Sequence, residues 1–245
     1  MSKRRVVITG MGILSPVGND LASNWEAIVA GRSGIAPITH FDASAFPTRI
    51  AGQVKGFDAS RWIAPKDIKK MDTFVHYGVA ASMMAIEDSG LDVAADGERV
   101  GVAIGAGIGG LKGIEDTTIK YHEGGPRKVS PFYVPSTIIN MIAGQVSIMT
   151  GAKGPNVAAV TACTTATHNI GLAMRMIQYG DADVMIAGGA ESTVTPLAIG
   201  GFASAKALST RNDEPEKASR PWDKARDGFV LGEGAGVDAL GSKCI

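Results

Sequence analysis

Asn156 to Tyr179 reads NVAAVTACTTATHNIGLAMRMIQY, and this stretch decides the fold. The breaker Gly154-Pro155 precedes it, and the valines after that breaker predict a short β-strand over 156–160. Apolar and small residues then recur at helical spacing, which predicts an amphipathic helix: Ala166, Ile170, Ala173, Met174 and Ile177. Gly180 is the expected end of this helix. Cys163 therefore lies on an abrupt turn between a strand and a helix.

This placement makes Cys163 a candidate nucleophile. A thiol at the first turn of a helix lies near unpaired backbone N–H groups and the positive end of the helix dipole, and both favour the thiolate. The same N–H groups could hold the oxyanion that forms when a thioester carbonyl is attacked. A buried structural cysteine is the alternative, and it is the commoner fate of a lone cysteine.

Composition limits the classes of protein to consider. The chain has 245 residues, 45% of them hydrophobic, which suffices for one large domain or two small ones. Its 24 basic residues balance its 24 acidic ones, so no global charge draws it to nucleic acid or to an anionic membrane. Cys163 and Cys244 are too few for a disulfide framework or a cysteine-rich metal site, and they suit a reducing cytosol. The start MSKRR resembles a signal peptide, but glycine, serine and proline interrupt the apolar run after it, so we expect a cytoplasmic protein without a membrane span.

The rest of the chain alternates strands and helices. The continuous apolar runs predict further strands, the first of them buried in a parallel sheet: 4–10, 99–104, 183–187 and 229–237. A helix capped by Asn19 or Asp20 is expected to bury a stripe that consists of Leu21, Trp25, Ile28 and Val29 and to end at Gly31. Further helices are expected over 72–89, before Gly90, and from a cap near Ser136, with Ile139, Ile142, Ala143 and Val146 on one face. Residues 32–62 and 209–227 are expected to be loops.

GAGIGG at 105–110 follows a predicted strand and matches the G-x-G-x-x-G pattern of dinucleotide-binding sites. No strand ending in an acidic residue appears about twenty residues later to hold a ribose. A nucleotide-binding oxidoreductase is therefore a weak alternative.

Several segments together resemble a known family. Gly154, Ala159, Ile170 and the run Ala162-Cys163-Thr164-Thr165-Ala166 are similar to the active-site pattern of β-ketoacyl-acyl-carrier-protein synthases of the elongating type. The similarity extends from Val6 to about Gly236 through four more segments: VVITGMGILSPVGN, GGPRKVSPFYVPSTIINMIAG, YGDADVMIAGGAES and ALSTRNDEPEKASRPWDKARDGFVLGEGAG.

The resemblance implies a thiolase-like αβαβα fold, of which residues 1–245 form mainly the N-terminal half, a mixed five-stranded sheet between helices. It implies acyl transfer to Cys163, followed by decarboxylative condensation with malonyl-acyl carrier protein. No cofactor is implied, because the phosphopantetheine of acyl carrier protein delivers the acyl groups. A homodimer is implied, with the strand 156–160 pairing with its copy at the two-fold axis.

The resemblance also implies binding sites. The implied acyl-pocket residues are Ile108, Tyr133, Val134 and Phe202, although many relatives have phenylalanine in place of Tyr133. Lys66, Lys69 and Lys70 follow Pro65 at helical spacing and would form one basic face for acyl carrier protein, with weaker candidates in Arg127, Lys128 and Lys206. Simple packing, or an ordinary solvated face, is the alternative for each of them.

The chain also departs from the family pattern. Relatives continue into a second half that supplies two histidines, a lysine and a gating loop, and the tail VDALGSKCI is not expected to continue the strand before it. We therefore expect an incomplete chain with exposed helix faces, stabilised by dimerisation, that has lost condensation and retains partial acylation; Cys244 is expected to be incidental. His168 lies about 140° around the helix from Cys163, at ~100° per residue, and is expected to be a surface or structural residue. A non-catalytic partner subunit of a condensing system is the remaining alternative.

Overall fold

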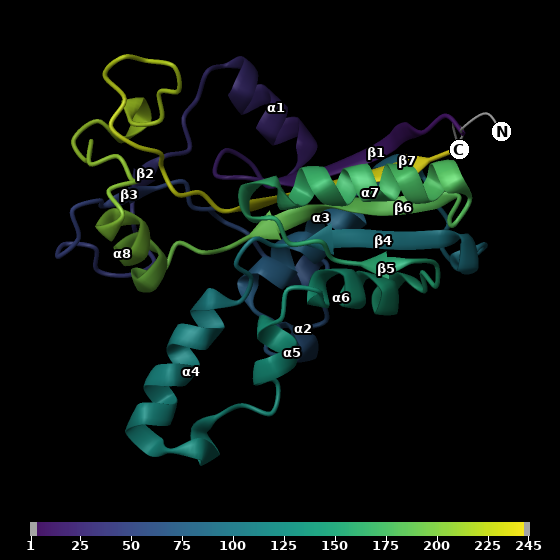
Figure 1. Cartoon of the computed structure of the whole chain (residues 1–245), viewed down its shortest axis with the longest axis horizontal. Helices are drawn as coiled ribbons and strands as arrows, with labels where there is room; N and C mark the ends of the chain where they lie inside the picture. Colours follow the sequence, from purple (N-terminus) through teal and green to yellow (C-terminus); the bar gives the residue numbers. More distant parts are fainter. Residues whose placement is uncertain (1–3, 243–245) are drawn as a thin grey trace.

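The structure is a computed structural model that describes residues 4–242. Its centre is a five-stranded mixed sheet in the order β1-β7-β6-β4-β5, which Figure 1 shows from β1 at the top to β5 at the bottom. The strands are β1 (Val7–Leu14), β4 (Val100–Gly105), β5 (Asn156–Val157), β6 (Val184–Glu191) and β7 (Gly234–Gly241). β4 is parallel to β5 and β6, whereas β7 is antiparallel to β6 and β1. The predicted mixed sheet is confirmed.

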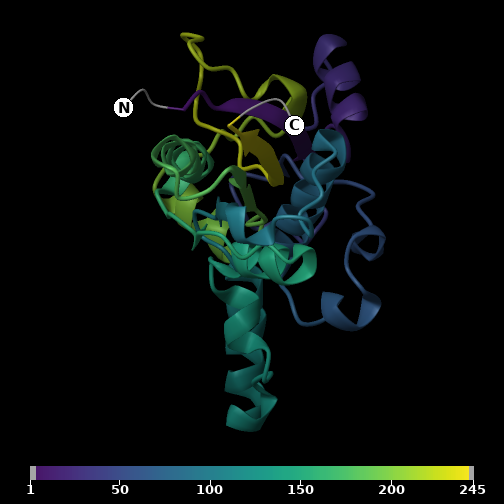
Figure 2. The ribbon, with the colours of Figure 1, turned by 90° about the vertical axis from the view of Figure 1, so that its right-hand side faces the viewer.

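Helices cover both faces of this sheet (Figures 1 and 2). On one face α3 (Thr73–Ser89) packs on β1, β6 and β7, and α6 (Met141–Thr150) packs on β4; on the other face α7 (Thr165–Tyr179) packs on β4, β6 and β7. α3 lies directly on the backbone of β1, because a Cβ atom at Gly12 would come within 1.9 Å of the carbonyl oxygen of Ala81. The predicted helix over 72–89 is therefore a central structural element, and Gly90 ends it with a φ of +66°.

The remaining elements lie around this three-layer body. β2 (Ala36–Pro37) and β3 (Ile50–Ala51) form a small separate sheet, and the other helices are α1 (Leu21–Val29), α2 (Pro65–Ile68), α4 (Leu111–Gly124), α5 (Tyr133–Thr137) and α8 (Pro196–Ser204). α4, α5 and the connection between them project from the body as an arm (Figures 1 and 2). Within residues 4–242, no helix has both the length and the hydropathy that crossing a bilayer requires.

The prediction that the first strand is buried in a parallel sheet is wrong. β1 is an edge strand that pairs antiparallel with β7, and its Ile8 and Met11 are exposed. The apolar run of this strand identifies a strand but carries no information on the direction of its neighbour.

The bounds of the last strand also differ from the prediction. β7 begins at Gly234 rather than at Phe229, since the residues before it form only isolated bridges, Gly52 with Gly232 and Leu208 with Phe229. It continues through VDALG to Gly241, so the expected break in the tail is wrong as far as residue 242. Cys244 lies outside the described residues.

The apolar stripe of α1 is exposed rather than buried. Asp20 caps the helix as predicted, because its Oδ1 accepts a hydrogen bond from the N–H of Ser23 at 2.7 Å. The exposed fractions of Trp25 and Val29 are nevertheless 67% and 69%. The buried residues of α1 are Asn24 and Ala27, and the Asn24 side chain bonds to Ser15 and to the carbonyl of Asp20. A polar side chain therefore anchors α1, and the apolar stripe faces away.

Residues 124–151 form two helices where one was predicted. α5 ends at Thr137, and α6 begins after Asn140, so Ser136 lies inside α5 and caps neither helix. The predicted inner face of α6 is confirmed for Ile142, Ala143 and Val146, all of which are buried.

Candidate active site

Cys163 lies in a 3₁₀ turn, Ala162–Thr164, that runs directly into α7. The thiol is free and exposed, which excludes the buried structural alternative. Ala162, immediately before it, has a φ of +52°. A residue with a Cβ atom adopts this left-handed conformation at a cost of roughly 1–2 kcal/mol. The nucleophile candidate therefore lies on a turn between strand and helix, as the sequence pattern indicated, and the structure adds that this turn is strained.

Side chains of α7 hold this turn in place. The amide of Asn169, which is fully buried, donates to the carbonyl of Ala159 and accepts from its N–H, both at 3.0 Å. The hydroxyl of Thr165 accepts from the N–H of Thr161 at 2.9 Å. The Asn169 bonds use the backbone groups of Ala159 that a longer strand would have paired, which is why β5 ends at Val157 and not at residue 160.

Sequence reasoning missed both Asn169 and Thr165. The available signal was their spacing, because both are polar residues on the side of α7 that carries Ala173 and Ile177. The predicted stripe is correct for those two, but Met174 is exposed, and Leu172 beside it is exposed as well. His168 is exposed too, with its Nδ1 2.7 Å from the hydroxyl of Thr161.

The turn lies at the carboxyl ends of β4 and β6. A Cβ atom at Gly105, the last residue of β4, would come within 3.0 Å of Thr165 Cγ2 and 2.5 Å of the carbonyl oxygen of Ala159. A Cβ atom at Gly189 of β6 would lie 3.0 Å from that of Ala166. α7 thus starts where these two parallel strands end, the edge at which α/β folds usually bind their ligands.

The GAGIGG segment forms the loop between β4 and α4, and its backbone donors are already used. Glu191, the last residue of β6, accepts hydrogen bonds from the N–H groups of Gly107, Ile108 and Gly109 at 2.8, 2.9 and 3.0 Å. Burial raises the pKa of Glu191, and these three N–H groups oppose the rise. A carboxylate of this chain thus occupies the place that a dinucleotide phosphate would need, so the dinucleotide interpretation is wrong.

The four predicted acyl-pocket residues lie on three elements. Ile108 is exposed on the glycine loop and follows Gly107, the loop residue that lies against Ala162 of the cysteine turn. Tyr133 and Val134 lie on α5, whose last residue, Thr137, accepts a hydrogen bond from the N–H of Gly110 at 3.2 Å and so connects α5 to the same loop. Phe202 lies on α8 and packs edge-to-face on Phe229, with ring centroids 5.3 Å apart.

The predicted basic face on the α2 segment is smaller than expected. α2 is a single turn that ends at Ile68, so Lys69 is its C-cap and Lys70 lies beyond it. The Lys70 ammonium is 2.7 Å from Asp67 Oδ1 and 5.5 Å from the ring centroid of Phe132, which leaves Lys66 and Lys69 as the exposed cations.

The other basic candidates lie elsewhere on the molecule. Arg127 and Lys128 are exposed at the tip of the arm, in the 3₁₀ turn after α4, and Lys206 follows α8 with a φ of +55°. Figures 1 and 2 show α2, the arm tip and α8 in separate regions, so the six residues do not form one patch.

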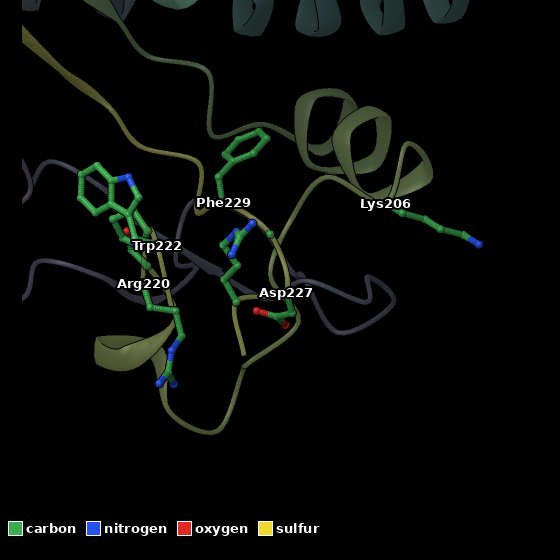
Figure 3. A pocket seen from close by; sticks show the side chains of 9 residues that line it. Lys206, Arg220, Trp222, Asp227 and Phe229 are labelled. Carbon is green, nitrogen blue, oxygen red and sulfur yellow. The ribbon is translucent and has the colours of Figure 1, made fainter. Parts of the chain in front are cut away.

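A hollow of about 800 Å³ lies next to Phe229 in the segment that follows α8. Figure 3 shows Arg220 and Trp222 on one side of it and the Lys206 side chain extending away. Trp222 is 94% exposed and has a φ of +64°, so a large apolar ring lies in solvent on a strained backbone. Sequence reasoning assigned no role to Arg220 or Trp222.

Fold and site together define a class: α/β proteins that present a cysteine on a strained turn between a strand and a helix, at the carboxyl edge of parallel strands. Comparison with known proteins specifies the class further. The family model described as "Beta-ketoacyl synthase, N-terminal domain" matches residues 3–243. The chain belongs to this family, and its fold is thiolase-like.

Individual relatives support the same assignment. The 3-oxoacyl-[acyl-carrier-protein] synthase 2 of Vibrio cholerae is 64% identical over 241 residues, which cover 98% of this chain and 58% of that protein. A solved β-ketoacyl synthase from Burkholderia phymatum has a TM-score of 0.86 at 32% identity and covers 97% of this chain and 59% of its own. A type II polyketide ketosynthase, solved in complex with an acyl-carrier protein, has a TM-score of 0.82 at 30% identity and covers 98% and 58%. The chain therefore spans a little over half the length of the relatives that it matches.

Proposed function

We propose that this chain is the cysteine-bearing part of an elongating 3-oxoacyl-acyl-carrier-protein synthase of fatty-acid synthesis. The observation that carries the proposal is the exposed thiol of Cys163 on the strained turn at the start of α7. The name of the Vibrio cholerae relative supports the reaction and the carrier. A cytoplasmic location goes with this reaction.

The proposed chemistry on this chain is transthioesterification. The Cys163 thiolate attacks the thioester carbonyl of an acyl group carried on phosphopantetheine, and a tetrahedral oxyanion forms. The oxyanion collapses, the carbon–sulfur bond to the carrier breaks, and the carrier thiolate leaves and takes up a proton. Cys163 then holds the acyl chain as a thioester, ready for condensation with the carbanion that malonyl-acyl carrier protein forms on losing carbon dioxide. No cofactor takes part in these steps.

Mass spectrometry tests the acylation step. The chain is incubated with an acyl-acyl carrier protein, and peptide mapping locates the added acyl mass, with Cys163→Ala as the control. We expect an adduct on Cys163 that the variant lacks. Binding of the carrier without acylation supports the non-catalytic partner subunit instead, and absence of both contradicts the proposal.

The proposed partners are acyl carrier protein and a second copy of this chain. Exposed Lys66 and Lys69 on the α2 segment are the primary docking cations, since Lys70 is already paired within the chain. The arm exposes Ile119, Tyr121 and Val134, an apolar surface suited to a second copy. In such a dimer α5 would approach the acyl chain bound to the neighbour.

A further inference from the structure

Glu191 is a half-buried carboxylate that no step of the proposed reaction uses. Its Oε2 accepts from Gly107 and Ile108, and its Oε1 accepts from Gly109, so consecutive backbone N–H groups converge on one side chain. Such a run of N–H groups forms a concave anion site. The anion that fills it here belongs to the chain itself.

The loop that Glu191 holds also contacts the cysteine turn. A Cβ atom at Gly107 would lie 2.9 Å from Glu191 Oε2, 3.1 Å from the carbonyl oxygen of Ala162 and 3.3 Å from its carbonyl carbon. Carboxylate, loop backbone and the backbone of Ala162 are therefore packed together without room for a further methyl group. Ala162 is the residue with the left-handed backbone that presents Cys163.

We infer that Glu191 is a positioning residue for Cys163. Its carboxylate fixes the glycine loop, and the loop supports Ala162 in its strained conformation, which keeps the thiol at the carboxyl edge of the sheet. The same bond to the N–H of Ile108 fixes where that side chain stands. The part of the inference that concerns Ile108 and acyl-chain length rests on the proposed function, whereas the part that concerns the thiol does not.

Two substitutions separate this role from simple packing. Glu191→Ala leaves all three N–H groups without an acceptor, so the loop loses its anchor and Ala162 can relax to an unstrained backbone. Glu191→Gln keeps one carbonyl oxygen for Gly107 and Ile108 but brings an amide donor against the N–H of Gly109, and we expect an intermediate effect. The matched control is Glu98→Ala, an exposed carboxylate in the 3₁₀ turn before β4, at the opposite edge of the sheet.

The first experiment measures the rate at which iodoacetamide alkylates Cys163. We expect Glu191→Ala to react roughly tenfold more slowly, because the thiolate is the reacting form and the helix N-terminus that favours it acts only over the first turn. Glu191→Gln should fall between that variant and the unsubstituted chain, and Glu98→Ala should match the unsubstituted chain. Formate, a carboxylate small enough for the vacated site, should restore the rate of Glu191→Ala in a saturable way, whereas neutral formamide should not.

Rescue by formate is a readout that loss of packing alone would not give. Circular dichroism checks that each variant is folded, and if Glu191→Ala is not, Glu191→Gln decides the question. An unchanged or faster alkylation rate in a folded variant overturns the inference, as does restoration by formamide to the same extent as by formate.

A second experiment concerns Ile108. Acyl transfer from pantetheine thioesters of increasing chain length is compared between the unsubstituted chain and Glu191→Gln, and we expect the variant to discriminate less between lengths. If both chains discriminate equally between acyl-chain lengths, the inference that Glu191 fixes the position of Ile108 is overturned. If the unsubstituted chain transfers no acyl group at all, the proposed function fails, and the alkylation result still decides the role of Glu191.

Discussion

Ala162 is one of three residues other than glycine with a positive φ among residues 4–242, and it is the one next to the nucleophile candidate. Its strain is balanced by the hydrogen bonds that α7 makes to Ala159 and Thr161. The turn is therefore held by its surroundings rather than by its own conformational preference, which is typical of functional turns.

Replacement of this residue tests the strain. Ala162→Gly removes the steric cost of the left-handed conformation but makes the unfolded chain more flexible, which costs about 0.5–1 kcal/mol. We expect the free energy of unfolding in urea to stay unchanged or to rise by up to about 1 kcal/mol. The control Ala22→Gly, at an exposed position in α1, should lower it by about 1 kcal/mol. An equal loss in both variants would show that residue 162 is unstrained.

Asn169 provides a second prediction at the same turn. Asn169→Ala leaves the N–H and the carbonyl of Ala159 without partners, and each buried unsatisfied group costs about 1–3 kcal/mol. We expect a loss of roughly 2–4 kcal/mol in the free energy of unfolding, together with slower alkylation of Cys163. Asn140→Ala, which removes an exposed amide that caps nothing through its side chain, should have little effect on either. Equal losses for both asparagines would contradict the assigned role.

At the level of secondary-structure elements, ion pairs of Asp183 connect the amino ends of β6 and β4. Asp183 bonds to Arg99 at 3.0 and 3.1 Å and to Arg4 at 2.5 Å. The hydrogen bonds from Arg99, with a smaller contribution from Arg4, lower the pKa of Asp183 from 3.8 to about 2. The folded state therefore favours the ionised carboxylate.

This preference for the ionised form makes the stability of the fold depend on pH. The contribution of Asp183 is fully present above pH 3.8, falls as the pH drops and is lost near pH 2. The side chains of Arg4, Arg99 and Asp183 are 45%, 36% and 41% exposed, so solvent screening should keep the contribution below about 1 kcal/mol. We expect Asp183→Asn to lower the free energy of unfolding at pH 6 and to match the unsubstituted chain at pH 2, with Asp181→Asn as control. A constant difference across this range would contradict the assignment.

The next prediction concerns binding of acyl carrier protein to the α2 segment. Lys66→Glu combined with Lys69→Glu should weaken binding of acyl carrier protein by about tenfold at low salt and reduce its salt dependence, since exposed charges act over roughly 10 Å. Lys70→Ala should have less effect, because its ammonium is bound by Asp67 and lies over Phe132. Lys153→Glu, an exposed lysine beside the 3₁₀ turn before β4, is the control, and titration by fluorescence anisotropy is the measurement. An equal loss with Lys153→Glu would indicate a nonspecific charge effect.

For the molecule as a whole, the predicted second copy can be tested through the arm. Ile119→Asp or Val134→Asp should shift the chain from dimer to monomer in sedimentation velocity at micromolar concentration, because each places a charge in the proposed apolar contact. Ile28→Asp, at an equally exposed apolar position on α1, is the matched control. Loss of the dimer with the control alone would place the interface on α1 instead.

Local patterns in the sequence predicted the elements that carry their own signal. α3 and α7 follow from apolar spacing and a glycine stop, and β4 and β6 from short apolar runs. The position of Cys163 between strand and helix follows in the same way. These features depend on residues close in sequence.

The wrong predictions concern features that depend on residues far apart in the sequence. Nothing within 4–10 indicates that β7 is its antiparallel neighbour, and nothing within α1 shows that Asn24 rather than Trp25 faces the body. Glu191 was not predicted as a ligand of the glycine loop, because 82 to 84 residues separate the donors from the acceptor. Direction of pairing, choice of buried face and long-range polar contacts are properties of the assembled structure.

The close contact between α3 and β1 limits which positions of the chain tolerate substitution. At Gly10 and Gly12 an added methyl group would meet the backbone of Ala85 and Ala81 at 2.4 and 1.9 Å, so neither surface can yield by a change of rotamer. A mutagenesis library should therefore keep these four positions fixed, whereas the outward positions of α1 can be randomised freely. A second library that also randomises these four positions tests this, because its soluble members should retain the four original residues.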